Sequence, residues 1–256
     1  MKQLFASCVI AFSTYSRIPM PQVEWNETNM RHTLACFPLV GAAVGLLFWL
    51  ADVICGRLGC GAVLRAALLT ALPVAVTGGI HLDGYCDTVD ALASHAGREK
   101  KLAILKDSAA GAFAVIWCCV WFLVYFGLMT EMGGGLTTTV AAGFLLSRTL
   151  SALAVDRLPS ARAGMGATLK ASSAFPWWVL LLYAAAYLAA VALLGAPVPG
   201  IAAFAAAAGF YCIYRRMALK VFGGFTGDLA GWFVTVCELV ILAAVILTDK
   251  VVTLWF

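Results

Sequence analysis

The stretch that decides the fold is AFAVIWCCVWFLVYFGLMT, Ala112–Thr130, which contains no charged side chain. A helix needs about 20 mostly apolar residues to cross the hydrocarbon core of a bilayer. Only a segment surrounded by lipid or by other apolar segments can keep so many large hydrophobic side chains away from water. The stretch therefore predicts a transmembrane helix.

The composition extends this prediction to the whole chain. Of its 256 residues, 63% are hydrophobic and 12% are charged, against roughly 45–50% and 25% in soluble globular proteins. These values exclude a soluble enzyme, a disordered chain and a disulfide-stapled secreted domain. The formal net charge of +4 is small, and no basic tail points to a nucleic-acid partner. We predict an all-α, polytopic integral membrane bundle that forms a single domain over residues 1–256.

The same length criterion predicts about seven membrane spans. They are Phe37–Ile54, Ala62–Ile80, Ala112–Thr130, Thr137–Val155, Trp177–Leu194, Ile201–Tyr214 and Gly231–Leu247. An odd number of spans places the two termini on opposite sides of the membrane. Leu4–Tyr15 is too short to cross, so we expect it to lie at the interface or to re-enter.

The basic residues predict the orientation, because Lys and Arg are enriched in cytoplasmic loops. With the N-terminus inside, all but four of them fall on the cytoplasmic side; Arg57, Arg65 and Lys250 fall outside and Arg148 lies within a span. We therefore predict a multi-pass protein of the cell (cytoplasmic) membrane with a cytoplasmic N-terminus. Its active-site loops, about residues 77–111 and 215–230, then lie on the cytoplasmic face.

A ladder of carboxylates occupies HLDGYCDTVD, His81–Asp90. At about 100° per residue, Asp83, Asp87 and Asp90 fall on one helix face, and His81 lies roughly opposite, which argues against a ligand role for it. Three like charges so close resist ionisation, which a bound cation relieves. Oxygen ligands favour Mg²⁺ or Mn²⁺ over zinc. The competing interpretation is a solvated, polar helix start, but solvation does not require a shared face.

Three further segments carry polar groups suited to phosphate or metal. Lys106 and Asp107 close the loop that follows the ladder, and RIPMP, Arg17–Pro21, supplies a cation on a rigid stretch. GGFTGD, Gly223–Asp228, offers glycines and a threonine near a helix start, where backbone N–H groups can cradle phosphate. Each signal is weak alone. Together they bring carboxylates, cations and flexible turns to one cytoplasmic face.

These motifs, in this order, resemble the cobalamin synthase family, the adenosylcobinamide-GDP ribazoletransferases, over almost the whole chain. The matching stretches are SRIPMP (16–21), FPLVG (37–41), TGGIHLDGYCDTVD (77–90), KDSAAG (106–111) and GGFTGD (223–228), followed by Glu238. The chain departs from the family pattern at Tyr85 and Cys86, where Leu-Ala is usual, and at Ala91, where Gly is usual. None of these departures replaces a carboxylate.

The resemblance implies a phosphotransfer. A ribose hydroxyl of α-ribazole, or of its 5′-phosphate, attacks the cobinamide-side phosphorus of adenosylcobinamide-GDP, GMP leaves, and a cobamide or its phosphate forms. Such a reaction requires positioning and charge neutralisation more than covalent catalysis, and a Mg²⁺ cofactor can provide the latter. The implied partners are the two small-molecule substrates and the lipid bilayer. A homo-oligomer and association with other cobamide-assembly enzymes stay open.

The resemblance also implies roles for the polar residues. Asp83, Asp87 and Asp107 are the expected metal ligands, with Asp90 as general base at the end of the ladder; Asp87 and Lys106 belong to the catalytic group. Lys106 and Arg17 are expected to hold phosphates. The segment Thr226-Gly227-Asp228 is expected to form a second phosphate or metal site, with Asp228 as its metal ligand.

Two other functions are compatible with an aspartate ladder in a membrane protein. A CDP-alcohol phosphotransferase has Asp-Gly-x-x-Ala-Arg, but Asp87 stands where that Ala-Arg pair should begin, and the later aspartates of its pattern are absent. A cation-coupled transporter places its site at mid-bilayer on broken, repeated helices, whereas we expect these aspartates at a cytoplasmic helix end without a repeat. Metal-dependent release of GMP separates the enzyme from the transporter.

Overall fold

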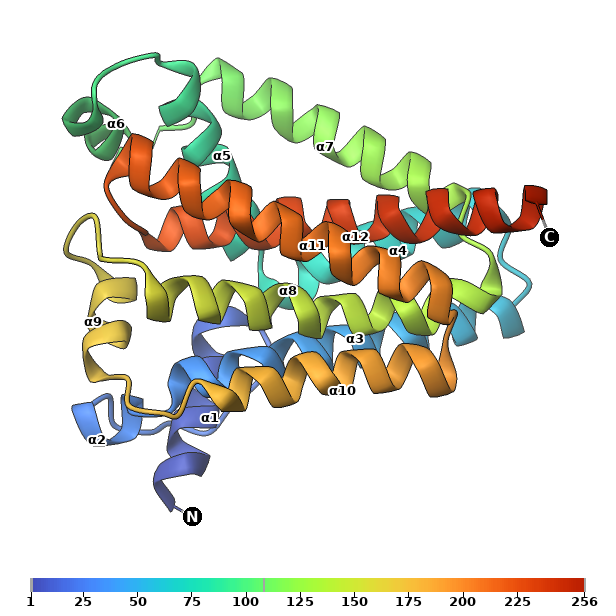
Figure 1. Ribbon diagram of the computed structural model, residues 1–256, viewed down its shortest axis with the longest axis horizontal. Helices are drawn as coiled ribbons and strands as arrows, with labels where there is room; N and C mark the ends of the chain where they lie inside the picture. The colour runs from blue at the N-terminus through green and yellow to red at the C-terminus, as the bar shows by residue number, and fades with distance from the viewer. Residues whose placement is uncertain (1, 108, 256) are drawn as a thin grey trace.

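The computed structural model describes residues 2–107 and 109–255 as a helical protein (Figure 1). Its helices are α1 (Lys2–Tyr15), α2 (Glu27–Met30), α3 (Thr33–Arg57), α4 (Ala62–Thr77), α5 (Ile80–Ala93), α6 (Arg98–Ile104), α7 (Ala112–Thr130), α8 (Thr137–Arg157), α9 (Met165–Ser172), α10 (Trp178–Leu194), α11 (Pro197–Met217) and α12 (Gly227–Trp255). A short π-helical turn, Ala218–Phe222, extends α11. Between the described residues the structure has no strand, only an isolated β-bridge, so the all-α prediction is confirmed.

The long helices confirm a polytopic membrane protein. Five helices, α3, α7, α8, α11 and α12, are long and apolar enough to cross a membrane by themselves. Helices α4 and α5 meet at a bend of 92° and together count as a sixth, broken span. The apolar helix α10 is shorter, at 17 residues, and occupies the position of the predicted fifth span. The helix of the predicted second span, Ala62–Ile80, begins at Ala62 as expected and ends slightly earlier, at Thr77.

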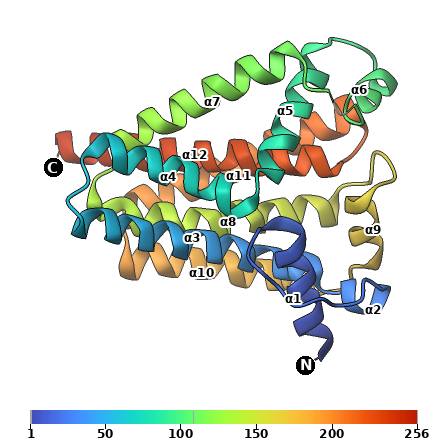
Figure 2. The ribbon, with the colours of Figure 1, turned by 180° about the vertical axis from the view of Figure 1, so that it is seen from behind.

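The two ends of the bundle differ in the helices and loops that they contain (Figures 1 and 2). Helices α2, α6 and α9, the start of α12 and the end of α8 gather at one end, which we call the loop end. The C-terminus lies at the opposite end, where two ion pairs, Arg65–Asp52 and Lys250–Glu131, are found. The basic residues assigned to one side of the membrane from the sequence thus gather at the loop end. Which side of the membrane this end faces stays a prediction.

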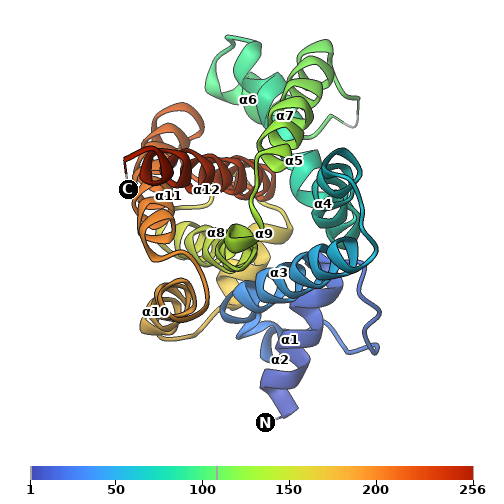
Figure 3. The same cartoon turned by 90° about the vertical axis from the view of Figure 1, so that its right-hand side faces the viewer.

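Helices α3 and α8 pack closely at the centre of the bundle, as the view along its axis shows (Figure 3). A Cβ atom on Gly41 would lie 2.2 Å from the carbonyl oxygen of Phe144, and one on Gly45 would lie 2.2 Å from that of Ala141. The two glycines form the Gly-x-x-x-Gly spacing that lets helices approach within a membrane. Close backbone contact thereby replaces the hydrophobic driving force that lipid does not provide.

A pair of glycines breaks the second span. Gly78 and Gly79 have φ values of +66° and +80°, a conformation that side chains with a Cβ rarely adopt. The backbone N–H of Arg17 donates to the carbonyl of Val76 at 2.7 Å just before the break. The bend lets α5 leave the direction of α4 and pack between α7 and α12. The break therefore determines where the carboxylate ladder lies.

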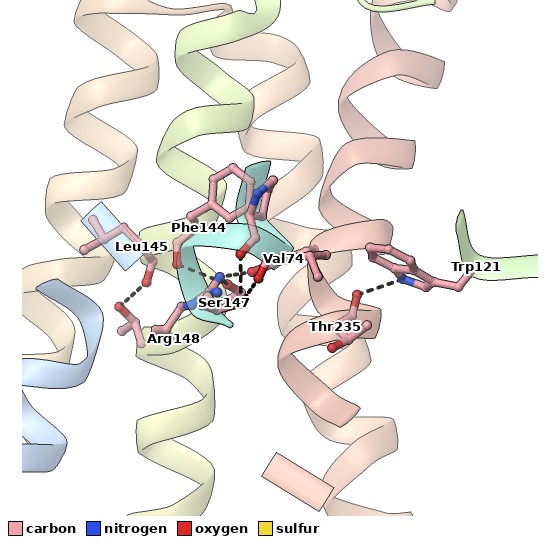
Figure 4. A network of polar contacts seen from close by, with 11 residues as sticks. Val74, Trp121, Phe144, Leu145, Ser147, Arg148 and Thr235 are labelled. Atoms are coloured by element: carbon pink, nitrogen blue, oxygen red, sulfur yellow. Dashed lines mark hydrogen bonds and ion pairs between the residues drawn. The ribbon is translucent and has the colours of Figure 1, made fainter. Parts of the chain in front are cut away.

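One ion pair lies inside the bundle (Figure 4). Arg148 of α8 is 1% exposed and pairs with Glu238 of α12, and its Nη1 also donates to Ser147 Oγ at 3.1 Å. Charges among membrane helices are costly unless they are paired, so this pair fixes α8 against α12. Glu238 lies about 15 Å along α12 from Asp228, and its ion pair gives it a place in the core instead of among the aspartates.

Candidate active site

The three aspartates of the ladder all lie on α5, as their spacing predicts. Asp87 is half-buried and lies within electrostatic range of Asp83, of Asp90 and of a fourth carboxylate, Asp228 at the start of α12. A cation, Arg162, is also in range. The structure thus gathers the ladder and the first turn of α12 at the loop end.

Glycines on both helices bring α5 and α12 together. A Cβ atom on Gly84 would lie 2.7 Å from the carbonyl oxygen of Asp228, and one on Gly231 would lie 3.1 Å from that of His81. Neither helix could carry a larger side chain at these positions without moving apart from the other. Gly84, which directly follows Asp83, is therefore the residue that allows Asp228 to join the ladder.

Arg162, in the loop between α8 and α9, connects three segments of the site. Its Nη2 lies 2.5 Å from Asp228 Oδ2 and donates to the carbonyl of Leu105 at 3.2 Å. The hydroxyl of Thr226 also donates to Asp228 Oδ2, at 3.3 Å, and accepts the N–H of Leu229 at 3.2 Å. Sequence reasoning missed Arg162, because no local motif distinguishes it from the other basic residues of the loops.

The Gly223–Asp228 segment is fastened to the loop after α8. The N–H of Phe225 donates to the carbonyl of Pro159, and the N–H of Ala161 donates to the carbonyl of Phe225, both at 2.9 Å. A Cβ atom on Gly224 would lie 2.1 Å from the Pro159 oxygen, so the contact requires glycine. Lys170 of α9 donates to the neighbouring Leu158 carbonyl, and its burial lowers the pKa of its amine. Part of the segment that was predicted to cradle phosphate therefore holds the loop after α8 in place.

Asp90 binds the N-terminus of α7 with both of its oxygens. Oδ2 accepts the N–H of Gly111 at 2.6 Å and Oδ1 accepts the N–H of Ala114 at 2.9 Å. A Cβ atom on Gly111 would lie 2.8 Å from the carboxylate oxygens, so this position also requires glycine. A carboxylate here satisfies N–H groups that have no partner within the helix and complements the helix dipole. Asp90 therefore caps α7.

Lys106 and Asp107 lie in the turn after α6, and both are exposed. Asp107 Oδ1 accepts the N–H of Ala109 at 3.1 Å. Within the described part of the chain, no hydrogen bond or ion pair joins either side chain to Asp83 or Asp87. Ser108, in the same motif, lies outside the described residues. Lys106 follows Leu105, which is bound to Arg162, so the turn borders the site without entering the ladder.

Arg17 lies at the opposite edge of the site. Its side chain crosses the glycine break, where a Cβ atom on Gly78 would lie 2.4 Å from Arg17 Nε. Arg17 and Asp83 line the same open depression of about 650 Å³, together with Thr77 and Gly79. Arg17 therefore lies beside Asp83, and its role in binding phosphate stays a prediction.

Two narrower hollows adjoin this depression. A partly open cavity of about 200 Å³ is lined by both Asp83 and Asp228, and a smaller one of about 140 Å³ by Asp228 and Arg162. The half-buried Tyr15 borders the larger cavity, and burial raises the pKa of its phenol to about 12, so it stays neutral. The three hollows adjoin because Asp83 belongs to the first two and Asp228 to the last two. Arg17 and Arg162 stand at the two ends.

The donor groups present suit a hard divalent cation. Asp83, Asp87 and Asp228 offer the carboxylate oxygens that Mg²⁺ prefers, and within the described residues Asp83 and Asp87 form no side-chain hydrogen bond. Over residues 2–107 and 109–255, however, no group of three His, Cys, Asp or Glu side chains is close enough to form a ready ligand set. The carboxylate oxygens suit the ion chemically. Asp228, however, is paired with Arg162, and Asp90 is bound to the N-terminus of α7.

Comparison with known proteins places this site in a family. The model of a family described as cobalamin-5-phosphate synthase matches residues 7–246. The chain belongs to that family. The membership confirms the resemblance seen in the sequence and decides against the phospholipid-synthesis and transporter hypotheses.

Relatives similar to the chain carry one name, adenosylcobinamide-GDP ribazoletransferase. The relative from Lachnoclostridium phytofermentans is 39% identical and covers 95% of this chain and 94% of its own length. Those from Desulfitobacterium hafniense and Clostridium botulinum are 34% and 31% identical, covering 91% and 94% of this chain and 93% and 96% of their own lengths. No solved structure matches the fold.

The break at Gly78 and Gly79 corrects one argument made from the sequence. The aspartates were expected at a cytoplasmic helix end, which distinguished them from transporter sites on broken, repeated helices. The ladder in fact begins directly after a break, as transporter sites do. Family membership, and not helix continuity, therefore separates the two functions.

Proposed function

We propose that the chain is an adenosylcobinamide-GDP ribazoletransferase. It transfers the adenosylcobinamide-phosphate group from adenosylcobinamide-GDP to α-ribazole or its 5′-phosphate, releasing GMP and completing the nucleotide loop of a cobamide. The observation that carries the proposal is the meeting of Asp83 and Asp87 of α5 with Asp228 of α12 between two arginines, in a chain of this family. Carboxylates flanked by cations suit a reaction on a diphosphate.

The reaction exchanges one phosphorus–oxygen bond for another. A ribose hydroxyl oxygen bonds to the cobinamide-side phosphorus, and the bond from that phosphorus to the bridging oxygen breaks, so GMP leaves with the bonding electrons. Asp87, which forms no side-chain hydrogen bond within the described residues, is the carboxylate we assign to accept the hydroxyl proton. Asp90, engaged by Gly111 and Ala114, positions α7, so we no longer give it the role of general base.

Mg²⁺ is the cofactor we propose, with Asp83 and Asp87 as its principal ligands and Asp228 and Asp107 as the further ones. When bound, the ion neutralises the diphosphate and acidifies the attacking hydroxyl. Recruiting Asp228 requires that Arg162 exchange this carboxylate for a phosphate oxygen, since both are anions that a guanidinium binds in the same geometry.

The cationic side chains hold the phosphates in this proposal. Arg17 binds at the edge shared with Asp83, and Lys106 extends from the turn next to Arg162. Thr226 and Gly227 bound the hollow that contains Arg162, where a hydroxyl and an exposed glycine backbone can contact a phosphate. Each of these groups stabilises negative charge that shifts towards the leaving GMP.

We place the protein in the cytoplasmic membrane with its loop end inside the cell. The support is the gathering of Lys and Arg at the loop end. In a cysteine-free background, Ser94→Cys should resist a membrane-impermeant maleimide in intact cells and react after permeabilisation. Ready labelling of intact cells would reverse the orientation. A homo-oligomer and contacts with other cobamide-assembly enzymes stay predictions.

The direct test of the activity uses purified protein in detergent. With adenosylcobinamide-GDP, α-ribazole and Mg²⁺, chromatography should show GMP and a cobamide appearing in equal amounts. Omitting α-ribazole or adding excess EDTA should stop both products. Failure to form a cobamide under conditions where a ribazoletransferase relative is active would refute the proposal.

A further inference from the structure

The cavity of about 200 Å³ that Asp83 and Asp228 line lies at the centre of the site. Its walls come from α1, α3, α5, α8, α9 and the start of α12. Tyr15, Phe37 and Phe225 are aromatic members of its lining, and Leu34 and Val155 are aliphatic ones. Its lining is mostly apolar, in contrast to the carboxylates Asp83 and Asp228 that belong to the same lining.

The volume of the cavity limits the size of the group that can bind in it. An apolar cavity of roughly 150 Å³ holds one benzene ring, so about 200 Å³ accommodates one bicyclic aromatic group. Sites that enclose whole drug-sized ligands are larger, roughly 300–1,000 Å³. A corrin macrocycle is therefore excluded, and a nucleoside can place only its base here.

Two buried polar atoms without a partner among the described residues help to decide which aromatic base the cavity binds. The Nε2 of His81 and the Oγ of Ser151 are buried, and within the described residues neither has a hydrogen-bond partner. Both residues line the cavity, one from α5 and one from α8. A buried polar group without a partner is destabilising, and a ligand atom that pairs with it removes that penalty.

The count of polar atoms separates guanine from the base of ribazole. Guanine carries a carbonyl, an amino group and several ring nitrogens, all of which lose water when the base is enclosed. A dimethylbenzimidazole joined to ribose has a single free ring nitrogen, an acceptor, on an otherwise apolar bicycle. A mostly apolar wall with one hydroxyl donor, Ser151 Oγ, to meet a single acceptor matches the second base. The rings of Tyr15 and Phe37 lie 6.0 Å and 5.8 Å from that of His81 and add an aromatic wall.

We propose that this cavity is the binding site for the aromatic base of the nucleoside substrate, with Ser151 as the donor to its ring nitrogen and His81 as part of the aromatic wall. The proposal rests on the proposed function and names the subsite within it. A nucleoside whose base fills the cavity has its ribose beside Asp83 and Asp228, where the attacking hydroxyl is needed. The GDP end of the other substrate then lies outside, towards Arg162.

Two variants of α8 test the assignment. Ser151→Ala removes one polar contact and should weaken α-ribazole binding about threefold to tenfold, the effect of one hydrogen bond, without lowering the melting temperature, because the lost hydroxyl was unpaired. Val155→Phe fills the cavity and should weaken that binding more than tenfold. Thr149→Val, on the same helix but outside the cavity, with its hydroxyl bonded to the Leu145 carbonyl of α8, is the matched control and should bind α-ribazole like the wild type.

Equilibrium dialysis of radiolabelled α-ribazole and of GMP against the purified, detergent-solubilised protein supplies the measurement. Loss of α-ribazole binding with GMP binding retained, in the Ser151→Ala and Val155→Phe proteins, supports the assignment. Unchanged α-ribazole binding in a folded Ser151→Ala protein, or selective loss of GMP binding, overturns it. If the wild type binds no α-ribazole, the proposed function fails as well. If Val155→Phe does not fold, Ser151→Ala decides.

Discussion

Replacement of Asp90 distinguishes a helix cap from a catalytic base. Asp90→Ala removes both acceptors from the N–H groups of Gly111 and Ala114. A helix cap contributes about 0.5–2 kcal/mol, and hydrogen bonds to a charged group contribute about 1.5–3 kcal/mol. Because Asp90 is half-buried, we expect a loss of about 2–3 kcal/mol. Asp90→Asn keeps one acceptor oxygen and should lose about half as much.

The assay is thermal unfolding in detergent combined with turnover. At roughly 2–4 °C per kcal/mol for a chain of this size, Asp90→Ala should lower Tm by about 4–12 °C, and Asp90→Asn by less. Turnover should fall in both but persist in Asp90→Asn, with the pH profile of the wild type. Asp107→Ala, at an exposed local turn, is the control and should change stability by about 0.5 kcal/mol or less. Abolished turnover in both Asp90 variants with unchanged Tm would refute the cap and restore the base.

Three further outcomes follow from contacts outside the ladder. Arg162→Met should raise KM for the GDP-activated substrate about tenfold or more, the effect of losing a charge-assisted hydrogen bond, and an unchanged KM would argue against phosphate binding. Gly84→Ala, whose Cβ would meet the backbone of α12 at 2.7 Å, should lose about 1–3 kcal/mol and most turnover, whereas Gly127→Ala, with open space around it, should lose neither. The hydrogen bond from Lys250 lowers the pKa of Glu131, so the stabilisation by this pair is present above the unfolded-state pKa and is lost as the pH falls through the lowered folded-state pKa. Glu131→Gln should therefore lower Tm slightly at neutral pH and have no effect on Tm in strong acid. A Tm difference that persists in acid would contradict the pairing.

The fold was predictable where hydrophobicity alone decides it. Uncharged stretches such as Ala112–Thr130 have one stable arrangement in lipid, a helix that satisfies its own backbone, and the structure agrees to the residue there. The adjacent glycines Gly78 and Gly79 allow a sharp turn, but the bend of 92° between α4 and α5 was not predicted, because glycine alone does not reveal the direction that the chain takes. The predicted span Gly231–Leu247 lies within α12, which continues past Asp249 and Lys250 to Trp255.

The site was predictable where one helix holds its residues. Asp83, Asp87 and Asp90 are linked by helical spacing, which the sequence displays directly. The sequence placed Asp228 on the same face of the membrane as the ladder but not in contact with it, and Arg162 was not identified as a site residue. Both positions depend on contacts between distant segments, through Gly84 and through the loop at Leu105, which no local pattern encodes. His81 was set aside as a metal ligand because it lies off the aspartate face, and its place in the cavity wall depends on packing against α1 and α3.

The most direct test of the central claim is turnover of Asp83→Asn and Asp87→Asn as a function of Mg²⁺ concentration. Each change keeps the shape of the side chain and removes the charge that binds the ion. We expect no turnover, or a residue of activity recovered only at much higher Mg²⁺, and a metal-free Tm that is unchanged or raised, because like-charge repulsion is relieved. Wild-type turnover in both variants, with an unaltered Mg²⁺ requirement, would contradict the assignment of these carboxylates and the mechanism built on them.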